Sequence, residues 1–250
     1  MTPNIHYENR EIEGERLELT DKTAIYWLGP NVTLRGCTLV TNVSARWLHL
    51  VSGTLIDCTI QAKSELKTLP WAAMKLKGCR FKGRFGGNDF GLREDLDERQ
   101  KLGGIEDCDF SEARLNGCRF RNCDMKTIRL PRWPCFTFLD PLRHVAELRR
   151  HAWPGLVGRA TVEAVCESPV GTVAVTGTRP PWPRRWTRRL RNCAPPWRRL
   201  PGFSCRCRLV TSAVTGEEGF VAWAATETGH LSLETTESER VLAAGTVGAW

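Results

Sequence analysis

The chain has 250 residues, of which 41% are hydrophobic and 26% are charged, and its formal net charge is +8. This length accommodates one or two domains. No apolar stretch reaches the roughly 20 residues of a transmembrane helix, and the N-terminus lacks the charged and apolar regions of a secretory signal. We therefore expect no contact with a membrane and a cytoplasmic location.

The N-terminal part of the chain, residues 1–31, is expected to be an irregular cap that contains a strand. Residues 15–20 alternate between polar and apolar side chains as a strand does, and residues 24–28 are mostly apolar. A repeat structure needs such a cap because its first unit has no preceding neighbour to cover it.

Residues 32–139 carry a sequence repeat. A cysteine returns every 21 residues, at Cys37, Cys58 and Cys79, and a strict five-residue repeat runs from Gly103 to Arg132. In each unit a large apolar residue lies two positions after a small one, so both side chains point to the same face of an extended segment. Glycine, aspartate or asparagine closes the units at turns. The repeat therefore predicts a square-sectioned coil of about 20 residues, stacked on its neighbours as a solenoid.

Equivalent positions of successive coils should stack inside this tube. The side chains predicted to do so are Cys37, Leu39, Cys58, Ile60, Cys79, Phe81, Cys108, Phe110, Leu115, Cys118, Phe120, Cys123, Met125 and Leu130. The spacing from Cys79 to Cys108 stretches to 29 residues. We assign the surplus to a charged loop over residues 84–102.

These residues resemble a known family, the pentapeptide-repeat proteins, most closely in the run CDFSE-ARLNG-CRFRN-CDMKT. The resemblance is strongest over residues 103–132, weaker over 32–83 and absent beyond residue 140. It implies an all-β fold, a right-handed parallel β-helix of quadrilateral section. The best-understood members of the family mimic a DNA duplex with a strongly acidic rod. Residues 1–135 carry 21 basic and 18 acidic side chains here, which disfavours that role.

The chain has 11 cysteines, and six of them occupy inward positions of the repeat. A buried cysteine behaves as a small hydrophobic residue. No Cys-x-x-Cys pair is present, so we expect structural thiols, with no zinc and no cofactor. Stacked free thiols also fit a reducing cytoplasm.

A small α+β region is expected over residues 140–178. A helix should begin at Asp140 and Pro141, with Leu142, Val145 and Leu148 as its apolar stripe. Two short strands are expected at 160–166 and 172–176.

Residues 179–208 contain ten arginines and three tryptophans but no lysine and no acid. This segment reads as a basic arm, as a disordered linker, or as a frameshifted stretch whose other reading frame encodes a helix-forming sequence. We favour the frameshift. The tail, residues 209–250, looks strand-like and offers no chemistry.

Three functions remain open. The first is a non-enzymatic scaffold for an unidentified protein partner, in a regulatory or toxin-neutralising role, with Arg80, Arg114, Arg119 and Arg129 as candidate contacts. The second is nucleic-acid binding through residues 179–208, because arginines contact phosphates and tryptophans stack on bases.

The third function is catalysis on a carbohydrate, which needs a pair of carboxylates across the scissile bond. The outward acids Asp89, Asp109 and Asp124 are interspersed with arginines and show no such pairing. We therefore predict a scaffold without catalytic residues, metal or cofactor. Open solenoid ends would also permit end-to-end association.

Overall fold

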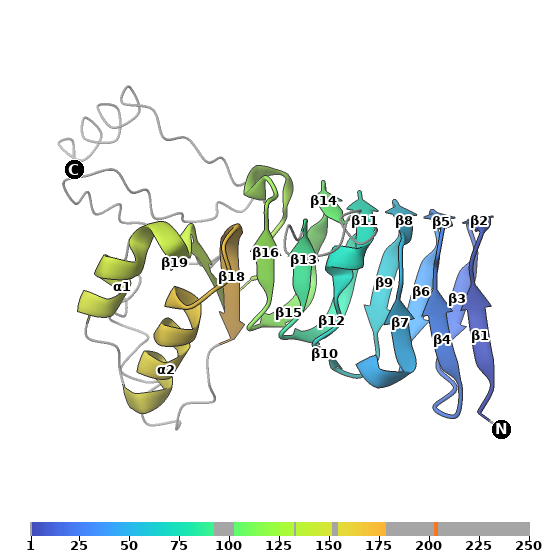
Figure 1. The fold of residues 1–250 in the computed structure, drawn as a ribbon, viewed down its shortest axis with the longest axis horizontal. Coiled ribbons are helices and arrows are strands. Elements are labelled where there is room, and N and C mark those ends of the chain that lie inside the picture. Colours follow the sequence, from blue (N-terminus) through green and yellow to red (C-terminus); the bar gives the residue numbers. More distant parts are fainter. Residues whose placement is uncertain (1, 93–102, 133, 152–154, 179–202, 205–250) are drawn as a thin grey trace, which may run out of the picture.

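The computed structural model describes residues 2–92, 103–132, 134–151, 155–178 and 203–204. Within this part, short strands stack along one axis as a parallel β-solenoid (Figure 1). Strand β1 (Asn4–Tyr7) lies at one end of the stack, and helices α1 (Val145–Arg150) and α2 (Gly155–Cys166) lie at the other. The expectation of a parallel β-helix is therefore confirmed.

Successive coils add strands one at a time to parallel sheets, and in sheets A and B the strand order follows the chain. Sheet A contains β1, β4 (Ile25–Leu28) and β7 (Leu48–Leu50). Sheet B contains β2 (Arg10–Glu13), β5 (Val32–Arg35), β8 (Gly53–Ile56), β11 (Met74–Lys77) and β14 (Gly104–Glu106). Sheet C contains β3 (Arg16–Leu19), β6 (Thr38–Thr41), β9 (Thr59–Ala62) and β12 (Arg80–Gly86), with β10 (Leu66–Lys67) and β15 (Asp109–Asn116) paired to β12.

Sheet D begins with β13 (Asp89–Gly91) and β16 (Arg119–Arg121), which are also parallel. Short 3-10 helices occupy some of the connections between strands. These are η1 (Ala45–Trp47), η2 (Trp71–Ala73) and η4 (Met125–Thr127).

Large apolar side chains fill the inside of the solenoid. Leu39 lies opposite Ile60, and Ile60 lies opposite Phe81. The Phe81 ring stacks on the Phe110 ring with centroids 4.4 Å apart, and all four side chains are at most 2% exposed. Because neighbouring strands are one strand spacing apart, these side chains meet face to face and exclude water.

The corner between sheets B and C explains why glycine and aspartate recur in the sequence. In successive coils it holds Gly14, Gly36, Asp57, Gly78 and Asp107, whose φ angles lie between 52° and 67°. Glycine adopts this left-handed conformation without strain, and aspartate does so more readily than most residues. The chain can therefore turn at the same place in every coil.

The solenoid begins earlier in the chain than expected. Residues 1–31, expected to be an irregular cap, instead supply strands β1 to β4. Ile12 and Leu17 take inward positions and are 8% and 7% exposed. The repeat pattern does not reveal this coil because Glu15 stands where the next coil carries the small residue Cys37.

The first part of the stretch expected to be a charged loop, residues 84–102, does not form a loop. Residues 84–91 continue the solenoid in β12 and β13. Phe85 and Phe90 are at most 1% exposed. Residues 93–102 lie outside the described part of the chain.

Asn88 occupies a small-residue position in this coil and is fully buried. Its side-chain amide donates to the Leu66 carbonyl at 2.9 Å, and its side-chain oxygen accepts the Leu69 N–H at 3.0 Å. These bonds replace the hydration that a buried amide loses. Asn88 thus ties this coil to the preceding one.

The regular repeat ends before residue 125. Cys123 and Met125, expected inside the tube, are only half-buried, and Met125 begins η4. Leu130 returns to the interior and is 5% exposed. The inward ladder is therefore interrupted by a 3-10 turn in its last coil.

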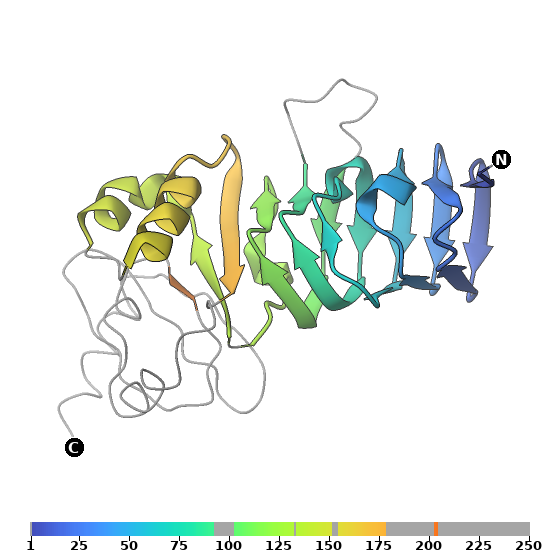
Figure 2. The same cartoon turned by 90° about the horizontal axis from the view of Figure 1, so that it is seen from below.

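An antiparallel extension closes the end of the solenoid beyond β16. Strand β18 (Thr172–Thr178) pairs antiparallel with both β16 and β17 (Cys135–Leu139), and β19 (Phe203–Ser204) pairs with β17. The two helices lie beside these strands (Figure 2). A second apolar cluster joins the helices to the strands through Phe138, Leu148, Val162, Val165, Cys166 and Val175.

The helices differ from the expected ones in position and extent. A 3-10 turn, η5 (Pro141–His144), precedes α1, and Asp140 has a left-handed φ of 46° and makes no capping hydrogen bond. Leu142 is 36% exposed, so it does not join Leu148 in an apolar stripe.

Residues 160–166, expected as a strand, lie in α2. Their β-branched residues suggested a strand, but Val162, Val165 and Cys166 are buried together, at the spacing of one helix face. The strand expected at 172–176 is present as β18. The basic segment and the tail lie outside the described residues, apart from the backbone of β19.

Replacing Phe120 with Asp should destabilise the fold strongly. Phe120 is fully buried and stacks on Phe90 with centroids 5.4 Å apart. The change removes a buried ring and buries a carboxylate, so we expect the free energy of unfolding in urea to fall by at least about 4 kcal/mol. The outward Thr59→Asp, opposite Arg80, should change it by no more than about 0.5 kcal/mol. Equal unfolding midpoints for the two variants would show that Phe120 does not support the core.

Candidate interaction surfaces

The parallel register brings outward side chains of neighbouring coils together in pairs. In sheet C, Lys82 lies opposite Glu112, and its Nζ is 3.0 Å from a carboxylate oxygen. In sheet D, Arg119 lies opposite Asp89 and donates to its two oxygens at 2.6 and 3.2 Å. Pairs of this kind contribute little stability where they are exposed, but they fix which side chains remain unpaired.

The four arginines predicted as contacts fall into two groups. Arg119 is held by the aspartate opposite it, and an Arg129 guanidinium nitrogen lies 3.8 Å from an Asp109 oxygen. Arg80 and Arg114 are exposed, and neither forms an ion pair with any residue that the structure describes. These two are therefore the ones with guanidinium groups available to a partner.

A further arginine was missed in the sequence. Arg84 of β12 lies directly opposite Arg114 of β15, and both side chains are exposed. The sequence did contain a signal for these outward positions. Arg84 and Arg114 directly precede the large apolar residues Phe85 and Leu115, which are buried. The signal was missed because residue 84 was assigned to a loop.

The outward acids considered for carbohydrate catalysis all make local contacts. Asp89 pairs with the arginine opposite it. Asp109 accepts the Ser111 N–H at 2.8 Å, and Asp124 accepts the Lys126 N–H at 2.9 Å as the cap of η4. Asp89 and Asp109 lie on different sheets.

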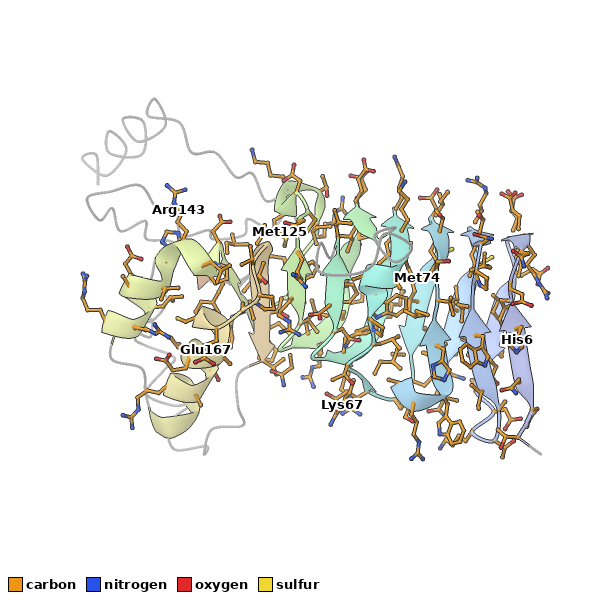
Figure 3. The ribbon with its side chains drawn as sticks, viewed as in Figure 1. His6, Lys67, Met74, Met125, Arg143 and Glu167 are labelled. Atoms are coloured by element: carbon orange, nitrogen blue, oxygen red, sulfur yellow. The ribbon has the colours of Figure 1, made fainter. Side chains whose placement is uncertain are left out.

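The outer surface of sheet A differs from the others because it carries aromatic and imidazole rings where they carry lysine, arginine, aspartate and glutamate. Its outward positions are Asn4 and His6 in β1, Ile25 and Trp27 in β4, and His49 in β7. We call these residues the sheet A face. The Trp27 ring lies between two imidazoles, with centroids 5.8 Å from that of His6 and 4.2 Å from that of His49. Figure 3 labels His6 at the N-terminal end of this row.

Apolar and charged groups border the sheet A face. Trp47 is half-buried, and the Arg46 guanidinium lies 5.2 Å from its ring centroid. Val51 is 37% exposed, and a Glu8 oxygen lies 3.9 Å from Nδ1 of His6. A centre with an aromatic ring and no lysine, arginine, aspartate or glutamate side chain, bordered by such charges, resembles the usual arrangement of a protein-binding surface.

The inward cysteines form a column in the core. Cys37, Cys58, Cys79 and Cys108 are free thiols and are at most 1% exposed. The Cys58 thiol donates to the carbonyl of Leu34 in the preceding coil at 3.3 Å. Each thiol of this kind satisfies a backbone carbonyl at a corner while filling little space.

Two inward thiols, those of Cys118 and Cys79, keep their protons at neutral pH. Burial raises the pKa of Cys118 to about 11. A hydrogen bond with the Cys108 thiol, together with burial, raises the pKa of Cys79 to about 12. Because the thiolate is the nucleophile and the metal ligand, the raised pKa values indicate a packing role.

Within the described residues, no three His, Cys, Asp or Glu side chains are grouped so that they could hold a metal ion. None of the helices in that part of the chain is both long and apolar enough to cross a bilayer. Comparison with protein-family models, curated proteins and solved structures finds no match to this chain. The surfaces described above therefore carry the functional argument.

Removing the Cys118 thiol should reduce the loss of stability in alkali. The unfolded thiol ionises near its ordinary pKa of 9.0, whereas the folded thiol keeps its proton to about pH 11. Between these values the unfolded state binds fewer protons, so the free energy of unfolding falls as pH rises. Cys118→Ala should remove up to about 1.4 kcal/mol per pH unit from that slope, measured by urea unfolding under reducing conditions. Thr59→Ala should leave the slope unchanged, and an unchanged slope for Cys118→Ala would contradict the assignment.

Proposed function

We propose that this chain is a non-enzymatic scaffold that binds a partner protein through the sheet A face. The observation that carries the proposal is the row of stacked rings of His6, Trp27 and His49 on the outside of the solenoid, which contains no lysine, arginine, aspartate or glutamate. Centres of protein interfaces are depleted in charge and enriched in aromatic residues, and tryptophan is prominent among their strongest contacts.

The other sheets serve as an internal comparison. Outward positions of sheet B include Glu13, Arg35 and Lys77, and sheet C carries Arg16 and further charges. A partner that covered those sheets would have to desolvate charged groups, which is unfavourable unless each finds a counter-ion. A partner that covers the sheet A face has fewer charged groups to desolvate.

Stacking also lowers the entropic cost of binding at this face. Trp27 is half-buried between its two neighbours, and its strand pairs with β1 on one side and β7 on the other. Side chains that are already ordered lose little conformational freedom when a partner covers them. A flat, pre-ordered surface suits a regulatory or toxin-neutralising partner, which needs to be bound without being altered chemically.

The proposal includes membership of the pentapeptide-repeat family and a cytoplasmic location. Support for the family comes from the five-residue units and from the left-handed corner residues that follow them. Support for the location comes from the column of free, buried thiols, since thiols persist in reducing compartments.

Placing a carboxylate next to the central ring of the sheet A face should weaken partner binding strongly. His49→Glu puts a carboxylate beside Trp27, and we expect retention of a specific protein in affinity capture from native lysate to fall at least tenfold, a change of about 1.4 kcal/mol or more. The matched control is Thr54→Glu, which adds the same charge at an outward position of sheet B in the next strand, β8. Thr54→Glu should retain the partner fully.

Three results would count against the proposal. The first is equal retention by the two variants, and the second is loss of retention only for Thr54→Glu. The third is capture of nucleic acid alone, released by salt, which would favour residues 179–208 as the functional segment. Both variants should melt like the parent, because both positions face outward. The partner is then identified by mass spectrometry and its affinity measured with purified components.

A further inference from the structure

Outward charges that face each other across neighbouring coils follow a rule with one exception. Within the described residues, the in-register charged pairs join opposite signs: Glu13 with Arg35, Lys77 with Glu106, Arg80 with Asp109, Lys82 with Glu112, Asp89 with Arg119, and Asp109 with Arg129. The exception is Arg84 with Arg114. Like charges directly opposite each other destabilise a sheet, so this pair calls for an explanation.

Neither arginine forms an ion pair with a neighbouring acid that the structure describes. The nearest acids along the strands and in the preceding coil are Glu112 and Glu65. Glu112 pairs with Lys82 at 3.0 Å, and Glu65 pairs with Lys67 at 3.4 Å. Lys67 itself points away from the solenoid at this edge (Figure 3). Among the described residues, therefore, no carboxylate lies within ion-pair distance of either guanidinium group.

The fold holds the two arginines close together and prevents them from moving apart. The next residues on the two strands, Phe85 and Leu115, are opposite each other and at most 1% exposed. Their burial fixes the register, so the two Cα atoms stay about one strand spacing apart, roughly 4.8 Å. Both guanidinium groups can therefore reach the same ligand on the outside of β12 and β15.

We propose that Arg84 and Arg114 form a binding site for a phosphate monoester dianion. Such a group carries a charge of about −1.5 to −2 and three strong acceptor oxygens, which match two guanidinium forks. A single carboxylate offers one charge and two oxygens. The site is separate from the sheet A face, so it stands whether or not that face binds a protein.

The first test measures thermal unfolding in millimolar inorganic phosphate or O-phosphoserine, against chloride at equal ionic strength. Binding to the folded state stabilises it in proportion to occupancy, so the parent protein should melt at a higher temperature with either phosphate. Arg114→Gln should abolish that increase. In chloride it should also raise the melting temperature by roughly 1–2 °C, because it removes the repulsion.

Arg119→Gln is the matched control, since it also removes one arginine charge, but from the pair of opposite charges that Arg119 forms with Asp89. It should lower the melting temperature and leave the phosphate effect intact. The proposal is overturned if Arg114→Gln keeps the full phosphate effect, or if it destabilises the protein as Arg119→Gln does. The effect should also shrink below the second pKa of the monoester, about 6; a pH-independent effect would likewise contradict a dianion site.

The second test separates a free phosphate from a phosphorylated side chain. A fluorescein-labelled peptide of glycine and serine with one phosphoserine is titrated with the full-length protein, and anisotropy is recorded. Inorganic phosphate is then added as a competitor to give its own affinity. If the peptide has the higher affinity, the natural source of the phosphate is a phosphorylated protein segment. If the two affinities are equal, the source is a small phosphate. Either result supports the site when Arg84→Gln abolishes binding. Equal binding of the unphosphorylated peptide, or tighter binding of a single-stranded oligonucleotide with its monoanionic phosphodiesters, would overturn it.

Discussion

In-register stacking of parallel coils is the constraint on which the rest of this structure depends. Each residue lies about 4.8 Å from its counterpart in the next coil, so whatever occupies a position must tolerate its own neighbours above and below. Inside the tube this favours repetition, as in the stacked rings of Phe81 and Phe110. Outside the tube it favours alternation of charge, as in Asp89 and Arg119. One geometric rule therefore governs both the core and the surface.

The interior could be read from the sequence wherever the five-residue phase is unbroken. Large residues two positions after small ones must share a face, which is why Leu39, Ile60 and Phe110 are buried as the repeat predicts. The five-residue spacing is interrupted where the register shifts between β12 and β15. For that reason Phe85 was assigned from the sequence to a loop and not to the core. In α2, β-branched residues indicated a strand, whereas packing against β17 and β18 selected the helix.

The surfaces were harder to predict because they depend on pairing between coils. A sequence shows that Arg114 faces outward, but the residue opposite it is set by the length of the intervening segment, which varies. The row of His6, Trp27 and His49 had a readable signal, since its members are 21 and 22 residues apart. It was overlooked because the first coil lacks the small residue that marks later ones. The periodicity of the sequence thus located the coils of the solenoid. Only the register between neighbouring strands showed which outward side chains lie opposite each other.

The antiparallel pairing of β18 with β16 divides the molecule into a part that can change length and a part that cannot. Each coil before β16 rests only on its neighbours, so a whole coil gained or lost there would leave both ends intact. The two helices and β17 are instead joined through one apolar cluster and must be kept as a unit. The separation between the sheet A face and the Arg84–Arg114 pair can therefore change in steps of a single strand spacing. The number of coils between the two surfaces therefore sets how far apart anything bound to them would be held.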